Sequence, residues 1–337
     1  MNLLVTGATG FVGSVLVPRL LGRPDVGEIA ALVPEGERLP AALRRGPVRI
    51  LRGDIRDRGT VRDACRGRSH VIHMAACISY RRRDRGLLLD VNVGGTANVV
   101  DGCLAAGAGR LVHISSVGAV GFHPDGRSAD EETPFNWPED FGYMTSKHRG
   151  QRVVEEAVRS RDLPAVILSP ASIMGPGDPD PHTPHNRLYR MACRGALLGS
   201  FAGGLSVVDV RDLVALIVRA LGAGRVGEKY LVAGANVEYA DVVRALGRAA
   251  GRRAIPLKIP APLLISAGTI LEGAAGLAGG RPLLTRSYGR LSGWRVYHSN
   301  EKSRREFAHT YIDFETTVRD GLDFYRRTLL SAGHSTH

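Results

Sequence analysis

The sequence predicts an α/β fold, with a doubly wound parallel sheet, helices on both faces and a smaller C-terminal lobe. Short apolar runs alternate with longer amphipathic segments up to about residue 175, as strands and helices do in βαβ units. The first apolar run ends in a glycine-rich turn that leads directly into a helical pattern. The length of 337 residues and the hydrophobic content of 44% suffice for one large domain with a lobe.

The first turn carries three glycines, each three residues after the last. Residues 2–5 predict a buried strand, and an apolar helical pattern follows. Gly7 allows a tight turn, Gly10 lets backbone approach a pyrophosphate, and Gly13 lets the helix pack closely on the sheet. The free N–H groups of a helix N-terminus favour phosphate there. Because the spacing is G-x-x-G-x-x-G, a plain strand-to-helix turn is the alternative interpretation.

Five further strands follow at intervals that suit right-handed crossovers. We predict them at residues 28–33, 47–52, 70–76, 110–114 and 165–168. The intervening segments predict a short helix near residue 61 and long helices at 87–106 and 143–161. Ligands bind at the carboxyl ends of such strands, so function is expected at that edge of the sheet.

Beyond residue 175 the pattern is less regular. Residues 205–210 predict a return strand, and we predict helices at 213–221, 239–250 and 314–330. The apolar stretch 260–280 contains five glycines and Glu272, which favours an amphipathic lid or packing helix over a transmembrane helix. The predicted domains are a dinucleotide-binding unit at 1–175 with a contribution from about 205–235, a substrate-binding lobe at 176–204 and 236–330, and a tail at 331–337.

The net charge of +12 comes almost wholly from arginine. The arginines are spread along the chain, which favours solvated faces over a nucleic-acid partner. Arg81 to Arg85 is interpreted as a solvated loop, with a negatively charged substrate as the alternative. The four cysteines form no C-x-x-C pair and Met1 leads straight into the first strand, so we expect reduced thiols, no signal peptide, no membrane span and a cytoplasmic location.

Tyr143 and Lys147 are four residues apart and share one helical face. A tyrosine hydroxyl has a pKa of about 10, and a nearby ammonium favours the phenolate. Lowering that pKa to 7 takes about 4 kcal/mol, so Lys147 needs help, which an oxidised nicotinamide ring would supply. Ser116, after the fifth strand, is placed to bind the same substrate oxygen. The three side chains predict proton transfer at a carbinol oxygen; a solvated helix face is the alternative.

His182 and His185 lie in a proline-rich segment without a cysteine or carboxylate at metal-ligand spacing. A surface loop is therefore expected there, and no metal site is predicted.

On these motifs the chain resembles the extended short-chain dehydrogenase/reductases of the NAD-dependent epimerase/dehydratase superfamily. Within them it is most similar to the dihydroflavonol reductase and 3β-hydroxysteroid dehydrogenase-like branch. The matching segments are Thr6–Gly13, Gly53–Asp54, His73–Ala76, Asn92–Thr96, Ser115–Ser116, Tyr143 with Ser146 and Lys147, Gly175–Asp178 and Lys302–Phe307.

The resemblance implies a Rossmann domain, a small-molecule substrate and a homodimer. It also implies that Tyr143 is the acid/base, that Lys147 contacts the nicotinamide ribose, that Ser116 contacts the substrate oxygen and that Asp54 faces the adenine. The other implied cofactor contacts are Gly7, Thr9, Gly10, Phe11, Val12, Gly13, Ile55, Ala75, Ala76, Asn92, Pro170 and Ser172.

The sequence departs from the family pattern at three positions. Ser169 and Met174 stand where arginine and tyrosine are frequent, which leaves the substrate class open, and Pro34 stands where NADP-dependent members often have arginine. Arg38 follows in a loop that is able to fold over the ribose. Glu35 and Glu37 would repel a 2′-phosphate, or one of them would bind the ribose 2′-hydroxyl of NAD. The surrounding charge and a reductase function favour NADP over NAD, with Arg38 as the phosphate contact.

We expect an NAD(P)(H)-dependent ketoreductase or alcohol dehydrogenase acting on a small organic or natural-product substrate. A nucleotide-sugar epimerase or dehydratase on the same scaffold is the first alternative, and a non-catalytic dinucleotide sensor is the second. A sensor has no need of Ser116, Tyr143 and Lys147 together, which argues against it.

Overall fold

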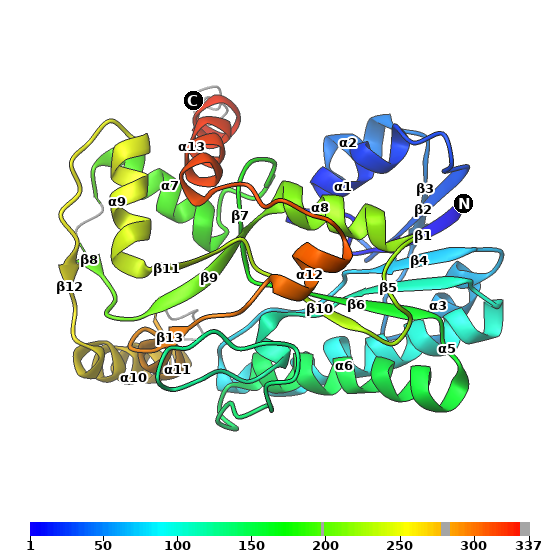
Figure 1. The fold of residues 1–337 in the computed structure, drawn as a ribbon, viewed down its shortest axis with the longest axis horizontal. Coiled ribbons are helices and arrows are strands. Elements are labelled where there is room, and N and C mark those ends of the chain that lie inside the picture. Colours follow the sequence, from blue (N-terminus) through cyan, green and yellow to red (C-terminus); the bar gives the residue numbers. More distant parts are fainter. Residues whose placement is uncertain (197–198, 278–283, 331–337) are drawn as a thin grey trace.

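The computed structural model describes residues 1–196, 199–277 and 284–330. Its largest element is a seven-stranded sheet in the order β3-β2-β1-β4-β5-β6-β10, in which all neighbouring strands are parallel (Figure 1). The order reverses between β1 and β4, which is the switch point where ligands bind in such sheets. The predicted fold class is therefore confirmed. The strands are β1 Asn2–Thr6, β2 Glu28–Val33, β3 Val48–Arg52, β4 His70–His73, β5 Arg110–Ile114, β6 Ala165–Pro170 and β10 Lys229–Val232.

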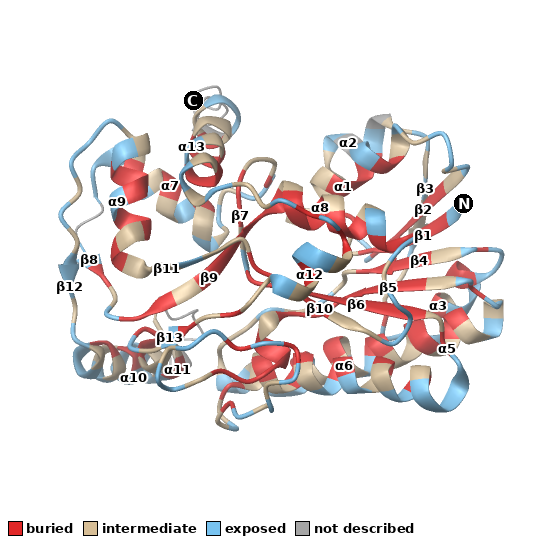
Figure 2. Ribbon diagram, viewed as in Figure 1, coloured by how far each residue is buried: buried red, intermediate tan, exposed pale blue. Residues whose placement is uncertain are grey.

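Helices cover both faces of this sheet. One aliphatic core forms under α1 (Phe11–Leu21), α2 (Ala41–Arg45) and α8 (Val210–Ala220). The other forms under α3 (Arg58–Cys65), α5 (Thr96–Ala106) and α6 (Gly142–Arg161). The central strands are buried throughout (Figure 2), which explains why they are continuous apolar runs instead of alternating patterns.

The helix predicted at 87–106 is interrupted. The chain runs through α4 (Arg85–Leu89), a π-helical turn at Asp90–Gly95 and then α5. The turn brings the carbonyl of Asn92 so close to α6 that a Cβ on Gly150 would lie 2.3 Å from its oxygen. Thr96 donates a hydrogen bond to the same oxygen at 2.8 Å. A π turn at this position therefore seats one helix tightly on the next, as such turns often do at functional sites.

The C-terminal lobe has its own sheet, ordered β11-β9-β13, with β7 also paired to β9. The predicted return strand at 205–210 is β9 (Gly204–Asp209) of this sheet, whereas α8 and β10 that follow it belong to the large sheet. The remaining strands are β7 Ser172–Met174, β8 Gly199–Ser200, β11 Ala235–Glu238, β12 Leu257–Lys258 and β13 Arg295–Val296. The lobe helices are α7 Pro184–Arg194, α9 Tyr239–Ala249, α10 Ala261–Leu277, α11 Arg286–Leu291, α12 Glu301–Glu306 and α13 Phe314–Phe324, which continues as a π-helix at Tyr325–Leu330.

Within the described ranges, no helix combines the length and apolarity needed to cross a bilayer. The apolar stretch at 260–280 forms α10, which packs on α11, as expected for a packing helix. Its end, residues 278–280, and the predicted tail at 331–337 lie outside the described residues.

Candidate active site

The glycine-rich turn joins β1 to α1 at the switch point. Gly7 has a left-handed φ of +72°, and a Cβ there would lie 2.7 Å from the backbone nitrogen of Ala75, so a side chain is excluded twice. A Cβ on Gly13 would lie 2.3 Å from the carbonyl oxygen of Ala8. Gly13 thus lets α1 lie close to the turn that leaves β1, and its role in packing the helix on the sheet stays a prediction.

The N-terminus of α1 is open to a ligand. Gly10 is its N-cap, no side chain caps it, and its first turn has no acidic residue. Gly10 is exposed, and Phe11 and Val12 are half-buried beside it. The free N–H groups and the dipole of the helix therefore meet no competing carboxylate in that turn, which suits the diphosphate of a dinucleotide.

His185 lies beside this turn, which the sequence did not predict. It belongs to α7 rather than to a surface loop, and its ring stacks on Phe11 with centroids 4.8 Å apart. Its Nε2 lies 2.8 Å from a carboxylate oxygen of the buried Asp178. Both partners lie in segments that the sequence analysis singled out, but Phe11 is far from His185 in sequence and nothing local indicates that the His185 ring reaches either of them.

Ser116, Tyr143 and Lys147 come together below the ends of β4 and β5. Ser116 is the N-cap of a short 3₁₀ turn, and its Oγ accepts from the backbone N–H of Gly118 at 3.1 Å. Burial raises the pKa of the Tyr143 hydroxyl, and a hydrogen bond with Ser116 opposes that rise. The structure thus joins the two hydroxyls that the sequence predicted would share one substrate oxygen.

Lys147 is almost completely buried and donates a hydrogen bond from Nζ to the carbonyl oxygen of Ile114 at 2.9 Å. Burial lowers the pKa of its ammonium to about 8. Because burial raises the pKa of Tyr143, the expected promotion of its phenolate needs more positive charge than Lys147 alone provides.

Two buried histidines on adjacent strands lie near Lys147. His73 on β4 and His113 on β5 are paired in register with ring centroids 5.3 Å apart. His73 contacts Thr6 at 2.8 Å and Thr96 at 3.1 Å, whereas neither ring nitrogen of His113 has a hydrogen-bond partner within the described chain. Burial first, and Lys147 second, lowers the pKa of His73 to about 3. Burial and the charges of His73 and Lys147 lower that of His113 in the same direction.

The side chain of Asn92, predicted to contact the cofactor, makes its hydrogen bonds to other residues of the protein. Its side chain accepts from the N–H of Cys77 at 2.7 Å, and its Nδ2 donates to the carbonyl of Cys77 and to Ser146, both at 2.9 Å. Asn92 therefore ties the segment after β4 to α6, one residue before Lys147.

The predicted residues at the adenine side lie at the ends of β3 and β4. The carboxylate of Asp54 is held by Arg56, whose Nη2 is 2.6 Å away and whose backbone N–H also donates to it. Ile55 is buried, and a Cβ on Gly95 would lie 2.5 Å from it. Ala76 is exposed after β4.

The remaining predicted contacts lie on two segments. Pro170 ends β6, and Ser172 begins β7 and is exposed. Arg38 is exposed in the loop after β2, and no hydrogen bond or ion pair connects it to the described parts of the chain. The neighbouring Glu37 accepts a hydrogen bond from Oγ1 of Thr9 at 2.6 Å, which places its carboxylate on the glycine-rich turn.

A series of aromatic side chains begins at Tyr143. Its ring lies 5.8 Å from that of Tyr80, which lies 5.7 Å from Tyr288 of α11. Tyr288 is 6.1 Å from Phe201, which is 5.1 Å from Tyr239 of α9. Burial raises the pKa of the Tyr80 and Tyr239 hydroxyls. These rings come from separate segments, so only the folded lobe brings them to the candidate catalytic tyrosine.

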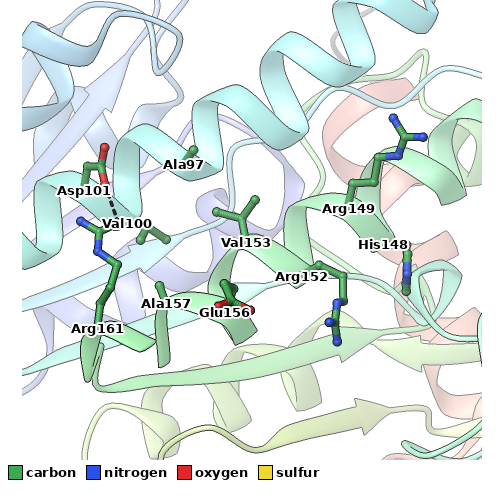
Figure 3. Close-up of a pocket in the computed structure, with 10 residues that line it drawn as sticks. All are labelled: Ala97, Val100, Asp101, His148, Arg149, Arg152, Val153, Glu156, Ala157 and Arg161. Carbon is green, nitrogen blue, oxygen red and sulfur yellow. Dashed lines mark hydrogen bonds and ion pairs between the residues drawn. The ribbon is translucent and has the colours of Figure 1, made fainter. Parts of the chain in front are cut away.

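A separate groove of about 660 Å³ runs along the outer surfaces of α5 and α6 (Figure 3). Apolar side chains form its floor and charged ones its rim, including Arg161, which hydrogen-bonds Asp101 at 2.8 Å. Lys147, by contrast, is buried on the inner side of α6. The groove is therefore distinct from the candidate active site.

The fold is that of enzymes that bind a nicotinamide dinucleotide at the switch point of a Rossmann sheet. Residues 3–233 match the model of the NAD dependent epimerase/dehydratase family. The chain belongs to this family and is of the extended short-chain dehydrogenase/reductase type, so the family resemblance of its motifs is confirmed.

Three similar proteins span almost the whole chain. It is 33% identical to sterol demethylase protein B of Methylococcus capsulatus, over 97% of this chain and 98% of that protein. It is 28% identical to a putative dihydroflavonol 4-reductase of Synechocystis, over 96% of this chain and 94% of that protein. The structure of Thermus thermophilus UDP-glucose 4-epimerase in complex with NAD aligns with a TM-score of 0.76 and 26% identity, over 98% of this chain and 100% of that one.

Proposed function

We propose that the protein is an NAD(P)(H)-dependent ketoreductase or alcohol dehydrogenase acting on a small organic or natural-product substrate. The observation that carries the proposal is the buried ammonium of Lys147, held by the carbonyl of Ile114 one helical turn from Tyr143, with Ser116 beside the Tyr143 hydroxyl. A bound nicotinamide supplies hydride transfer to or from a carbon atom. The protein has to supply the proton for the oxygen on that carbon and hold it in place.

Each of the three side chains has a distinct task in this proposal. Ser116 orients the substrate oxygen by a hydrogen bond, and Tyr143 gives or takes its proton. Lys147 presents a positive charge that lowers the pKa of Tyr143 when both face the bound dinucleotide. The resting bond from Lys147 to Ile114 keeps the ammonium at the sheet edge, one turn below Tyr143. The N-terminus of α1 holds the diphosphate.

The aromatic series supports an apolar substrate skeleton. Tyr80, Tyr288, Phe201 and Tyr239 offer ring faces and edges, with hydroxyls at a few points only. Pockets of this kind bind flat or alicyclic molecules and use a small number of polar groups for orientation. The similarity to sterol demethylase protein B and to the putative dihydroflavonol 4-reductase is in keeping with that chemistry.

A nucleotide-sugar epimerase or dehydratase is the competing function, favoured by the similarity to UDP-glucose 4-epimerase. Such a substrate needs cations for its diphosphate. Before the proline that ends β6, where arginine is frequent in the family, this chain has Ser169. Ser169 is buried, and its Oγ donates a hydrogen bond to Oε1 of Gln151 at 3.4 Å. This position therefore supports the reductase.

A substrate panel tests the choice. Purified protein is mixed with each dinucleotide and with cyclic ketones, sterol-like alcohols and uridine or thymidine diphosphate sugars, and nicotinamide absorbance is followed. Stoichiometric oxidation or reduction of a cyclic alcohol or ketone supports the proposal. Turnover of a nucleotide sugar, detected chromatographically without net absorbance change, would contradict it.

For the cofactor we propose NADP, with the exposed Arg38 contacting the 2′-phosphate. The bond between Glu37 and Thr9 is a specific observation in favour of NAD, because a carboxylate at this turn can accept from a ribose 2′-hydroxyl. Arg38→Ala is expected to weaken NADP binding about tenfold and to spare NAD, whereas Glu37→Gln should improve NADP binding. Calorimetric titration of both cofactors decides this, and a wild type that prefers NAD would refute the proposal.

We also propose that two copies pair through the groove on α5 and α6. Its rim carries both signs of charge, including Arg149, Arg152 and Glu156, as a self-complementary two-fold interface requires. Sedimentation equilibrium is expected to give a dimer that Val153→Arg dissociates. A wild-type monomer at all concentrations would exclude it.

A further inference from the structure

Helix α10 has an apolar surface that the protein leaves uncovered. It runs from Ala261 to Leu277 and carries one charged side chain, Glu272. Its inner stripe packs on α11: Cβ atoms added to Gly268 and Gly289 would lie 2.5 Å from Thr285 and 2.7 Å from Leu264. A helix that is apolar all round is normally buried on all sides. This one is not, as Figure 2 shows by its exposed and intermediate colours.

The outward face of α10 holds large side chains. Leu263 is 62% exposed and Ile270 is 70% exposed, and their separation of seven residues places them on one face, away from the Leu264 and Gly268 stripe. Ile255 and Leu257, in the segment leading to α10, are each 66% exposed. Clustered exposure of this kind marks a surface that meets an apolar partner.

A second segment extends this surface toward Tyr143. Tyr80 contacts Tyr288 of α11 at 5.7 Å, so the segment from Ile78 to Leu87 lies beside the α10–α11 pair. Ile78 is 69% exposed and Leu87 is 43% exposed. We define the docking surface as Ile78, Leu87, Ile255, Leu257, Leu263 and Ile270.

Exposed basic side chains lie on the same segments as this docking surface. Arg82 and Arg85 are exposed on the Ile78–Leu87 segment, and the exposed Arg286 begins α11. The nearby acids are engaged: Asp84 pairs with Arg81 at 2.5 Å, and Glu272 accepts from the N–H of Arg286 at 3.2 Å. Exposed apolar side chains with arginines on the same segments suit the interface of a bilayer that contains anionic lipid.

We propose that this docking surface seats the enzyme on an anionic membrane without spanning it, so that the aromatic series opens toward the bilayer. Docking gives the arginines near Arg81 a role other than the solvated loop or the negatively charged substrate that the sequence suggested. It goes beyond the proposed reaction, and it also supplies a route by which an apolar substrate reaches Tyr143 from the lipid. Membrane binding is measured without turnover, so its failure and that of the proposed function are distinguishable.

Vesicle co-sedimentation of the full chain tests the proposal. Vesicles of phosphatidylcholine alone are compared with vesicles of equal parts phosphatidylcholine and phosphatidylglycerol. We expect binding to the anionic vesicles that weakens with salt, because the Debye length falls from about 10 Å at 0.1 M to about 3 Å at 1 M. Arg82→Ala with Arg85→Ala should weaken binding about fivefold per arginine. Leu263→Ser with Ile270→Ser should weaken it at least about tenfold.

Matched controls are available away from the docking surface. Val226 is 52% exposed and Arg62 is exposed on α3, and neither Val226→Ser nor Arg62→Ala should change vesicle binding. Retained dinucleotide binding and circular dichroism show that each variant is folded. Absence of binding to anionic vesicles, or equal losses in the controls, overturns the proposal. So does a self-association in the wild type that Leu263→Ser with Ile270→Ser abolishes, because a second copy then covers α10.

Discussion

The dinucleotide-binding half and the C-terminal lobe differ in the size and composition of their cores and in how much apolar surface they leave exposed. In the first half, aliphatic strands are buried on both faces and form two large cores. In the lobe, the core is smaller and contains aromatic rings such as Tyr189 and Tyr325, and α10 leaves apolar surface outside. A regular scaffold holds the common chemistry, and an irregular lobe holds what is specific to this chain.

Some of the polar groups that the first half buries lie near the candidate active site. Lys147 is buried with one hydrogen bond, and His113 is buried with none that the described chain provides. Burial of a charged or unpartnered polar group costs free energy of folding. Groups of this kind cluster at active sites, which agrees with the place where the dinucleotide is expected.

The largest expected effect is on turnover. Tyr143→Phe removes the hydroxyl and keeps the ring, so steady-state kinetics should show a loss of turnover of about 10²-fold or more, with dinucleotide affinity nearly unchanged. Tyr311→Phe is the matched control, since that hydroxyl contacts Ser303 at 2.8 Å outside the site. A Tyr143→Phe enzyme with near-normal turnover would place the acid/base elsewhere.

The next largest effect distinguishes two glycines of the glycine-rich turn: Gly10, expected to contact the dinucleotide, and Gly13, which contacts the protein itself. Gly10 has an ordinary φ of −77°, and a Cβ there would meet nothing closer than 3.6 Å. Gly10→Val should therefore fold normally and weaken dinucleotide binding at least about tenfold by calorimetry, because the side chain occupies the phosphate site. Gly13→Val should instead lower the melting temperature, since its Cβ meets Ala8 at 2.3 Å. Unchanged affinity in Gly10→Val would argue that the diphosphate lies elsewhere.

The smallest effect is on stability in acid. Burial lowers the pKa of His73 to about 3 and lowers that of His113 in the same direction. Below about pH 6.5 the unfolded chain therefore binds protons at these two histidines, whereas the folded chain does not. Stability is thus full above about pH 6.5 and falls as the pH drops, by about 1.4 kcal/mol per pH unit for each histidine. His113→Leu should flatten this slope in urea unfolding, whereas the exposed His182→Gln should not. An unchanged slope in His113→Leu would show that this ring titrates normally.

Regular parts of the fold were predictable for local reasons. The strands at 28–33 and 110–114 match β2 and β5 because apolar runs bounded by turns specify a buried strand. The Tyr143–Lys147 pair and Ser116 were likewise found from spacing and from their place after a strand. The helix at 87–106 was predicted without its π turn, since nothing local reveals that the Asn92 carbonyl has to approach Gly150.

By itself, the sequence determined the parallel sheet, its glycine-rich turn and the identity of the residues at the strand ends, because each depends on periodicity or on a short motif. Only the tertiary structure decided which distant side chains meet: His185 on Phe11, Tyr80 between Tyr143 and Tyr288, and Glu37 on Thr9. It also decided that α10 has one face packed and one exposed, which its nearly uniform apolar composition conceals. Periodicity is encoded locally, whereas contacts across the lobe depend on packing between segments far apart in the chain.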